Sequence, residues 1–406
     1  MAKHLWLSIV HRPSSIMLIG IDGIPLGAPK TGIGHYTFEL ARTLAALDPA
    51  NEYELISPST ASAAEAAKGV PLPSNLQTVH RPANRLRKHW WTIGLPLYAG
   101  RRGLSLFHGT NYSIPLWNRC PTVVTIHDLS LLLHSATHQE HLVRRGRLRL
   151  PIMVKTATKI ISDSASVKRE ICEHFGVPAK KITVVPLAPR RAFHPVAAAE
   201  SAEALQRLGV ELEFILFVGT VEPRKNLLTL VRAFDELLRH TDARPQLVIA
   251  GQKGWLTEEL FALVEQSGLK ERILFTGYVS DEDLRALYSA CRACVYPSLY
   301  EGFGLPPLEA MACGAPVITS RIPVIMETVG EAARLVNPKD APALAQSLAE
   351  VLRDENERQR LSRAGLERAA QFTWEQTARL TLDVYEEILR VADRAARAGS
   401  ADVPSA

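Results

Sequence analysis

Residues Ala293–Ser320, ACVYPSLYEGFGLPPLEAMACGAPVITS, contain the pattern from which the rest of the chain can be interpreted. The pattern predicts a short strand over Ala293–Tyr296, a loop rich in Gly and Pro, a helix of about two turns and a second strand over Val317–Thr319. The pair Pro306–Pro307 suits a first helical turn, whose amide groups have no intrahelical partner, and Gly314 suits the position just past the helix end. Residues 293–320 therefore predict one strand–helix–strand unit.

Two glutamates flank the start of this helix. Glu301 lies in the loop, and Glu309 lies within the helix. The free N–H groups of a helix N-terminus favour an anionic ligand, and a carboxylate one turn further can accept hydrogen bonds from the two hydroxyls of a ribose. The alternative is one glutamate on a surface loop and one on an exposed helix face.

The segment Glu301-Gly-Phe-Gly-Leu-Pro-Pro-Leu-Glu309 resembles the E-x7-E signature of the retaining nucleotide-sugar glycosyltransferases of family four. That family has the two-domain GT-B fold. The resemblance extends over nearly the whole chain from residue 16 onward and is strongest over Gly219–Ser320.

Strand and helix patterns alternate in both halves of the chain, which predicts an α/β protein with two doubly wound, Rossmann-like sheets facing each other across a cleft. The length of 406 residues fits two or three domains. The predicted organisation is an N-terminal extension, expected to be disordered (1–15), an acceptor domain (16–190), a linker (191–212), a donor domain (213–372), a helix that by resemblance crosses back to the N-terminal domain (373–398) and a tail (399–406).

The composition limits the functional classes. The net charge of +5 is too small to predict nucleic-acid binding. No apolar run of about 18 residues predicts a membrane-spanning helix, and residues 1–15 lack a good cleavage site for a signal peptide. Five scattered cysteines indicate reduced thiols and a cytoplasmic location. Because no second cysteine pair follows Cys291 and Cys294, this C-x-x-C predicts a helix end entering a strand rather than a zinc site.

Two basic segments, Arg81–Arg102 and Arg144–Arg149, have two explanations. With Trp90, Trp91 and Leu95 they could lie on an anionic membrane surface, making the protein peripheral at the inner face of the membrane. They could equally be solvated basic helix faces.

The N-terminal half begins with a strand over Ile16–Gly20, a glycine-rich loop and a helix over His35–Leu47. This order can cradle a phosphate, because glycine allows a close backbone approach and the helix N-terminus points amides at the anion. The loop has neither a complete G-x-G-x-x-G nor a Gly-Lys-Ser/Thr, so a dehydrogenase or P-loop protein is disfavoured. By resemblance, Gly32 and Gly34 face the donor diphosphate and the acceptor.

Polar residues follow several predicted strands, at the end where open α/β sheets bind ligands. His108 and Asn111 follow the strand over residues 104–107, and His127 and Asp128 follow the strand over 122–126. Ser164 could cap the next helix or touch a ligand. The candidate acceptor-side residues are His108, Asn111, Asp128 and Ser164.

Arg224 and Lys225 lie between a buried strand and a helix, where two cations can hold a diphosphate. Such cations accelerate glycosyl transfer if they hold the leaving diphosphate more tightly as its charge grows. The sequence has no convincing Asp-x-Asp set that would hold a divalent metal, so we predict no metal and no cofactor besides the donor.

The resemblance assigns roles to individual residues. It implies a catalytic set of His127 (near the 6-position of the sugar), Arg224, Lys225 and Glu301, with Glu301 and its loop on the sugar hydroxyls and Glu309 on the ribose. The donor-binding set that it implies is Gly32, Gly34, Gly219, Tyr278, Val279, Gly302, Phe303, Gly304, Leu305 and Glu309. The loop that contains Tyr278 would bind the base largely through backbone groups.

The loops Thr31–Gly34 and Gly219–Asn226 look most like those of bacterial mannosyltransferases of cell-surface polysaccharide assembly. The expected reaction is retaining transfer of mannose from GDP-mannose to a glycan or lipid-linked acceptor. A UDP-hexose donor is the alternative. A nucleotide-sugar epimerase on the same fold would need no acceptor, and an inactive scaffold would be expected to lack Arg224, Lys225 or Glu309.

Overall fold

The computed structural model describes residues 16–27, 32–58, 71–80, 89–117 and 119–401. The predicted extension over residues 1–15, the basic residues 81–88 and the last predicted tail residues, 402–406, lie outside this part of the chain. None of the described helices has the length and apolar composition that crossing a bilayer requires.

The first sheet has seven strands in the order β3-β2-β1-β4-β5-β6-β7. Its strands are β1 (Leu18–Asp22), β2 (Glu52–Ser57), β3 (Leu76–His80), β4 (Leu106–Gly109), β5 (Thr122–Ile126), β6 (Lys159–Ser162) and β7 (Ile182–Val184). The pairs of β1 with β2 and β4, of β2 with β3, and of β6 with β7 are parallel. Every residue of β1 and β5 is buried, as expected for strands covered on both faces.

The helices of this half connect the parallel strands. They are α1 (Gly32–Leu47), the π-helical turn η3 (Trp90–Gly94), α3 (Leu95–Arg102), α4 (Ser130–Leu133), α5 (Glu140–Thr156) and α6 (Ala165–Phe175). Ser164 caps α6 by accepting a hydrogen bond from the Val167 amide.

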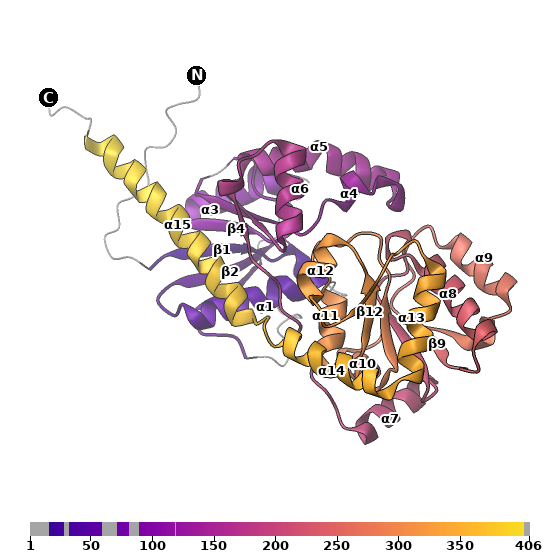
Figure 1. The fold of residues 1–406 in the computed structure, drawn as a ribbon. Coiled ribbons are helices and arrows are strands. Elements are labelled where there is room, and N and C mark those ends of the chain that lie inside the picture. Colours follow the sequence, from indigo (N-terminus) through magenta and orange to yellow (C-terminus); the bar gives the residue numbers. More distant parts are fainter. Residues whose placement is uncertain (1–15, 28–31, 59–70, 81–88, 118, 402–406) are drawn as a thin grey trace. The chain divides into compact units, whose positions relative to one another are not determined.

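The second sheet has six strands in the order β10-β9-β8-β11-β12-β13, and all neighbours are parallel. Its strands are β8 (Phe214–Val218), β9 (Gln246–Ala250), β10 (Ile273–Gly277), β11 (Ala293–Tyr296), β12 (Val317–Ser320) and β13 (Arg334–Val336). Helices lie on both of its faces (Figure 1). A continuous apolar core joins β8, β9 and β11 to helices that include α8 (Leu227–His240), α9 (Glu258–Ser267) and α13 (Ala341–Arg353).

The remaining helices of this half are α7 (Ala198–Leu208), α10 (Asp281–Ala290), α11 (Leu305–Ala312), α12 (Pro323–Val329), α14 (Glu355–Ala369) and α15 (Trp374–Ala401). The strand–helix–strand unit predicted over residues 293–320 is present as β11, α11 and β12. The two parallel sheets confirm the predicted α/β fold class.

By their contacts the residues form two compact units, Met1–Val123 with Tyr385–Ala406, and Val124–Val384. This division does not coincide with the sequence-based boundaries, which stay predictions. In the first unit, the Tyr385 hydroxyl of α15 lies 2.7 Å from His108 Nδ1 of β4. In the second, the same helix is tied to residues that follow β7, because Trp374 Nε1 donates to the Pro189 carbonyl.

Several local expectations were wrong. Proline usually interrupts a helix, which would predict a break at Pro151, but α5 continues through this residue. The expected linker contains α7. Trp90 and Leu95 are 5% and 1% exposed, so these two side chains belong to the core and not to a membrane-facing surface. Trp91 is partly buried. The Trp91 ring lies 6.5 Å from the ring of Phe107 in β4.

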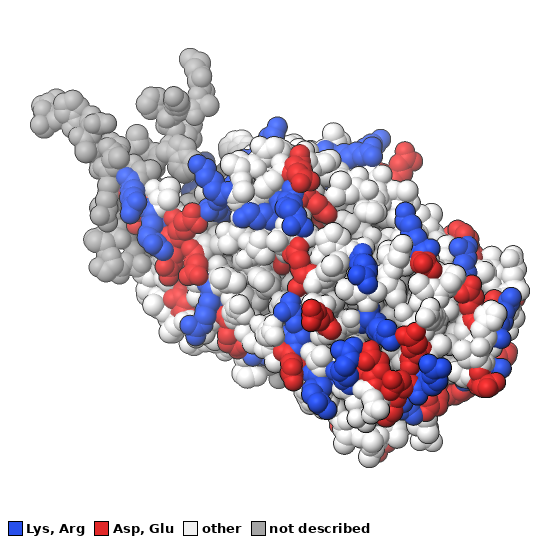
Figure 2. Space-filling view, viewed as in Figure 1, with Lys and Arg blue, Asp and Glu red and all other residues white. Residues whose placement is uncertain are grey.

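Charges of both signs are interspersed over the described part of the face drawn in Figure 2, particularly over the second unit. This distribution agrees with the small net charge of the chain.

Candidate active site

Strand order explains why the predicted cationic pair and the first glutamate come together. The connections from β8 and β11 lead to opposite sides of the second sheet, although these strands are neighbours. Such a switch point leaves a crevice at the carboxyl ends of the two strands, where open α/β sheets bind ligands. Arg224 and Lys225 follow β8, and Glu301 follows β11.

A 3₁₀ turn, η6 (Pro223–Lys225), presents the two cations. Asn226 ends it with a φ of 60°, a left-handed conformation that asparagine tolerates better than most residues. The Asn226 side-chain amide donates to the carbonyls of Pro297 and Pro338 at 2.9 and 2.6 Å. These bonds fasten the cation-bearing turn to the loops after β11 and β13.

Arg224 and Lys225 form a buried ion cluster with two carboxylates. Lys225 Nζ lies 2.8 Å from Glu301 Oε1, and Arg224 Nη1 lies 3.2 Å from Glu301 Oε2. The other terminal nitrogen of Arg224 lies 2.6 Å from Glu222 Oε1. Lys225 also donates to the Tyr296 hydroxyl. Sequence reasoning missed Glu222 and Tyr296, since neither belongs to the glutamate signature.

The pKa shifts in this cluster follow from burial and charge pairing. Burial alone would raise the pKa of Glu301, but the charges of Lys225 and Arg224 outweigh it and lower that pKa to about 2. Burial lowers the pKa of Lys225, an effect that Glu301 opposes. Glu301 is therefore ionised at neutral pH.

The cations keep hydrogen-bonding capacity beyond their carboxylate partners. Arg224 Nε is buried and has no hydrogen-bond acceptor among the described residues. Lys225 has three N–H donors, of which Glu301 and Tyr296 take two. A buried, unused guanidinium donor beside a lysine suits an anionic ligand such as a phosphate.

The loop that carries Glu301 packs directly on residues after β5 and β6. A side chain at Gly302 would place its Cβ 1.8 Å from the His127 carbonyl oxygen, so only glycine fits there. Ser164 donates to the Gly302 carbonyl at 2.9 Å while it caps α6. The predicted cap is present, and the same hydroxyl contacts the Gly302 loop. Contact of Ser164 with a ligand stays a prediction.

His127 is held by a buried aspartate. His127 Nδ1 and Asp163 Oδ2 are 2.7 Å apart. Burial raises the pKa of Asp163, whereas His127 lowers it. A carboxylate at Nδ1 fixes the orientation of the ring and the tautomer it adopts. Sequence reasoning did not identify Asp163 as a site residue.

Tyr300, which precedes Glu301 in the same loop, contacts residues of α6 and of the segment after β5. Its hydroxyl donates to Glu170 at 2.6 Å and accepts from the Leu129 amide at 2.9 Å, while its ring packs on His134. Burial, and then the charge of Arg224, lowers the pKa of His134. A hollow of about 280 Å³ adjoins Tyr300 and Glu301. Its lining includes Arg169, Glu170, Glu173 and Pro323.

The second glutamate of the signature lies in a separate cluster. Glu309 is buried on α11 and receives both Nε and Nη2 of Arg190, at 2.8 and 3.0 Å. Arg190 Nη1 lies 2.6 Å from Asp281, the first residue of α10. Sequence reasoning did not identify Arg190.

The other predicted residues are dispersed. His108 is fully buried inside β4 and not beyond its end. Gly32 and Gly34 lie in the first turn of α1, in the other compact unit. Asn111 and Val279 are partly buried, and Asp128 accepts hydrogen bonds from Ser130.

Gly219 follows β8, and its amide donates to the Ala250 carbonyl. Tyr278 is 61% exposed. Phe303 is buried, Gly304 has a φ of +91° and Leu305 begins α11. These role assignments stay predictions.

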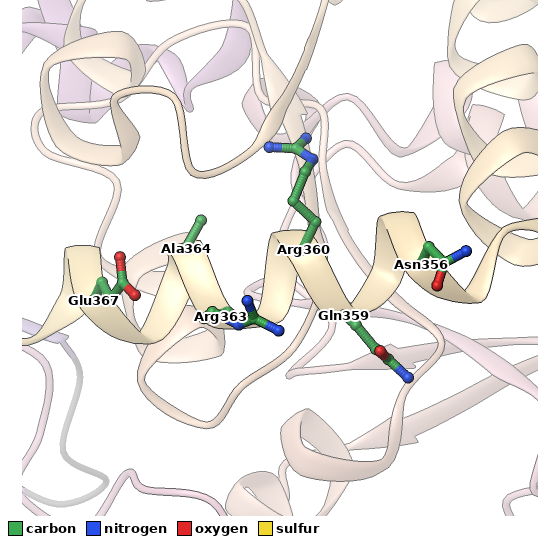
Figure 3. A pocket seen from close by; sticks show the side chains of 6 residues that line it. All are labelled: Asn356, Gln359, Arg360, Arg363, Ala364 and Glu367. Carbon is green, nitrogen blue, oxygen red and sulfur yellow. The ribbon is translucent and has the colours of Figure 1, made fainter.

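A hollow of about 360 Å³ lies on one face of α14, and no predicted site residue lines it (Figure 3). Its lining residues all belong to that helix, so it is a surface groove and not part of the site. Among the described residues, no group of three His, Cys, Asp or Glu side chains could hold a metal ion.

Two parallel α/β sheets and a cationic pair at a switch point form a site suited to a phosphorylated ligand. The family profiles "Glycosyl transferases group 1" and "Glycosyltransferase Family 4" match residues 203–368 and 30–188. The O-antigen chain mannosyltransferase B of Escherichia coli is 33% identical over 379 residues, 89% of this chain and 97% of that protein. The chain therefore belongs to the family-four type of glycosyltransferases and is an enzyme that transfers a glycosyl group.

A further relative and two solved structures are similar to this chain. The MMP alpha-(1->4)-mannosyltransferase of Mycolicibacterium hassiacum is 30% identical over 363 residues, 80% of this chain and 83% of that protein. Among solved structures, sucrose-phosphate synthase from Thermosynechococcus elongatus superposes with a TM-score of 0.74 at 24% identity, covering 92% of this chain and all of that one. HepE from Anabaena, solved with UDP and glucose, gives a TM-score of 0.70 at 18% identity, with coverage of 92% and 100%. These structures confirm the GT-B fold.

The pKa of Glu301 predicts a pH-dependent contribution to stability. Because that pKa is lowered from an ordinary value of 4.5 to about 2, the stabilisation is fully present above pH 4.5 and is lost as the pH falls toward 2. We expect Glu301→Gln to be roughly 3 kcal/mol less stable than the wild type at pH 7, and the difference to shrink across this window. Chemical denaturation at each pH measures it. The exposed variant Glu386→Gln should follow the wild type; a Glu301→Gln difference that is constant with pH would contradict the ion cluster.

The Asp163–His127 contact predicts that the two side chains act as one unit. Asp163→Asn and His127→Ala should each lower turnover by about tenfold to a hundredfold, and the double variant should lower it no further. Turnover is followed by release of the nucleoside diphosphate, with thermal melting as the control for folding. Losses that multiply in the double variant would show that the residues act independently.

Proposed function

We propose that this enzyme transfers mannose from GDP-mannose, with retention of configuration, to a glycan or lipid-linked acceptor in the assembly of a cell-surface polysaccharide such as an O-antigen. The observation that carries the proposal is the identity of 33% with the O-antigen chain mannosyltransferase B across 97% of that protein. A second mannosyltransferase matches at 30%.

In this proposal Arg224 and Lys225 hold the donor diphosphate. The unused Arg224 Nε and the third Lys225 donor supply hydrogen bonds to phosphate oxygens. As the bond between the sugar and the phosphate breaks, negative charge grows on the leaving oxygen, and fixed cations in a buried site stabilise that charge. The two side chains take the role that a divalent metal has in other transferases, so the reaction needs no metal.

A front-face displacement fits the carboxylates of the site better than a double displacement. A double displacement needs a carboxylate free to attack the anomeric carbon. Both oxygens of Glu301 bind cations, and Asp128 accepts hydrogen bonds from Ser130. In the front-face reaction the anomeric carbon loses its bond to the phosphate oxygen and gains one to the acceptor oxygen. The acceptor's proton passes to the leaving phosphate.

The proposal for the donor base, guanine or uracil, rests on the loop after β10. The expected base-binding loop follows β10, and its Tyr278 is largely exposed. Recognition through backbone groups leaves UDP-hexose as the alternative donor. An epimerase is the second candidate class, and it would form product from the donor alone.

The membrane contact that we propose lies on α5. Leu148 and Ile152, one helical turn apart, are 67% and 44% exposed, and Arg144, Arg145 and Arg147 are exposed beside them. Figure 2 shows basic side chains along the edge where Figure 1 places α5. An exposed helix face that combines apolar and basic residues suits an anionic lipid surface.

A donor screen tests the proposed reaction. Release of GDP or UDP is monitored for GDP-mannose and UDP-hexoses, with and without a lipid-linked acceptor and with EDTA. We expect acceptor-dependent release of GDP from GDP-mannose, and we expect EDTA to leave this release unchanged.

Lys225→Ala should lower kcat more than it raises KM, with a loss of about 2–4 kcal/mol in transition-state stabilisation. The exposed control variant Lys270→Ala should leave kcat unchanged. Product from the donor alone would favour an epimerase, and an unchanged kcat would remove Lys225 from the mechanism.

Flotation with lipid vesicles tests the α5 surface. The wild type should float with vesicles that contain anionic lipid and not with neutral ones, and binding should weaken as salt rises. Replacing Arg144, Arg145 and Arg147 with Gln should abolish flotation but preserve nucleotide binding. Equal flotation of wild type and variant would contradict the proposal.

A further inference from the structure

Arg190 connects two parts of the expected nucleoside site. It lies in the segment between β7 and α7, before the first residue that the sequence assigned to the linker. Its guanidinium makes a two-pronged contact with Glu309 on α11 and a third contact, through Nη1, with Asp281 at the start of α10. Asp281 directly follows the loop 277–280, which we expect to hold the base.

The geometry of Arg190 is fixed from several sides. Its side chain is 16% exposed, and its guanidinium carbon lies 4.2 Å from the ring centre of Phe193. Burial alone would lower the pKa of Arg190, but the charges of Glu309 and Asp281 raise it. A planar guanidinium that binds both oxygens of a carboxylate also fixes the plane of that carboxylate. Glu309 can therefore not rotate freely.

This contact still leaves Glu309 able to bind a ligand. An ionised carboxylate has about four lone-pair sites, and Arg190 occupies two of them, one on each oxygen. One site on each oxygen remains. Two acceptors at the spacing of a carboxylate match two neighbouring hydroxyls, which is the arrangement in a ribose.

We propose that Arg190 is a positioning residue for the nucleoside of the donor: it holds the Glu309 carboxylate so that its remaining lone pairs accept both ribose hydroxyls. Through Asp281 it also ties this carboxylate to the base-binding loop. The inference rests on the proposed function, because it assumes a nucleoside diphosphate donor. The site would then distinguish a ribose from a 2′-deoxyribose at Glu309. Arg190 would determine the size of this difference in affinity.

The test compares ribo- and 2′-deoxyribonucleotides. Calorimetry measures binding of GDP and 2′-deoxy-GDP, and of UDP and 2′-deoxy-UDP, to the wild type, Arg190→Ala, Arg190→Lys and Arg191→Ala. Arg191 is the matched control, since it is the neighbouring residue and forms an exposed pair with Glu375. The wild type should prefer the ribonucleotide by roughly tenfold to a hundredfold, the value of one hydrogen bond to a charged group.

Arg190→Ala should reduce this preference to less than about threefold, mainly by weakening ribonucleotide binding, and Arg190→Lys should give an intermediate value. Arg191→Ala should keep the wild-type preference. An unchanged preference for the ribonucleotide in Arg190→Ala overturns the proposal. If Arg190→Ala fails to fold, the same criterion is applied to Arg190→Lys.

The remaining outcomes separate the inference from the function on which it rests. A wild type that binds both sugar forms equally overturns the role of Glu309 and Arg190 but leaves nucleotide binding intact. A wild type that binds none of the four nucleotides overturns the proposed function itself.

Discussion

The buried ion cluster of Arg224, Lys225, Glu222 and Glu301 is the interaction on which the site depends. Taking charges out of water is costly, and such a cluster persists only when each charge is paired and hydrogen-bonded. Here the cost is offset because the cations bridge the loops after β8 and β11, two neighbouring strands whose connections diverge. The same pairing leaves donors of Arg224 and Lys225 unused, so a site balanced in charge can still accept a phosphate.

The sequence predicted those parts of the fold and site that depend on local pattern. The predicted apolar strand ACVY, residues 293–296, matched the structure, as did the proline-led helix after Glu301. The sequence singled out Arg224, Lys225 and Glu301 as groups that bind the donor, but it did not predict that their side chains pair with one another. Proline at position 151 was misleading, because it lies inside α5 without ending the helix.

Contacts between distant residues could not be predicted from one sequence. Asp163 is 36 positions from His127, and Arg190 is 119 positions from Glu309. Neither separation has a local signature: Asp163 precedes the helix-capping Ser164, and Arg190 is the last residue before the predicted linker. In both cases the missed residue orients one that was predicted. The family signature therefore identifies groups expected to touch the donor, and the structure identifies the groups that hold them in place.

A crystal structure with a bound nucleoside diphosphate tests the central claim most directly. The account predicts the terminal phosphate within hydrogen-bonding distance of Arg224 and Lys225, and the ribose hydroxyls on the Glu309 carboxylate. A nucleotide bound at any other place, with the ion cluster making no contact to phosphate, would contradict it.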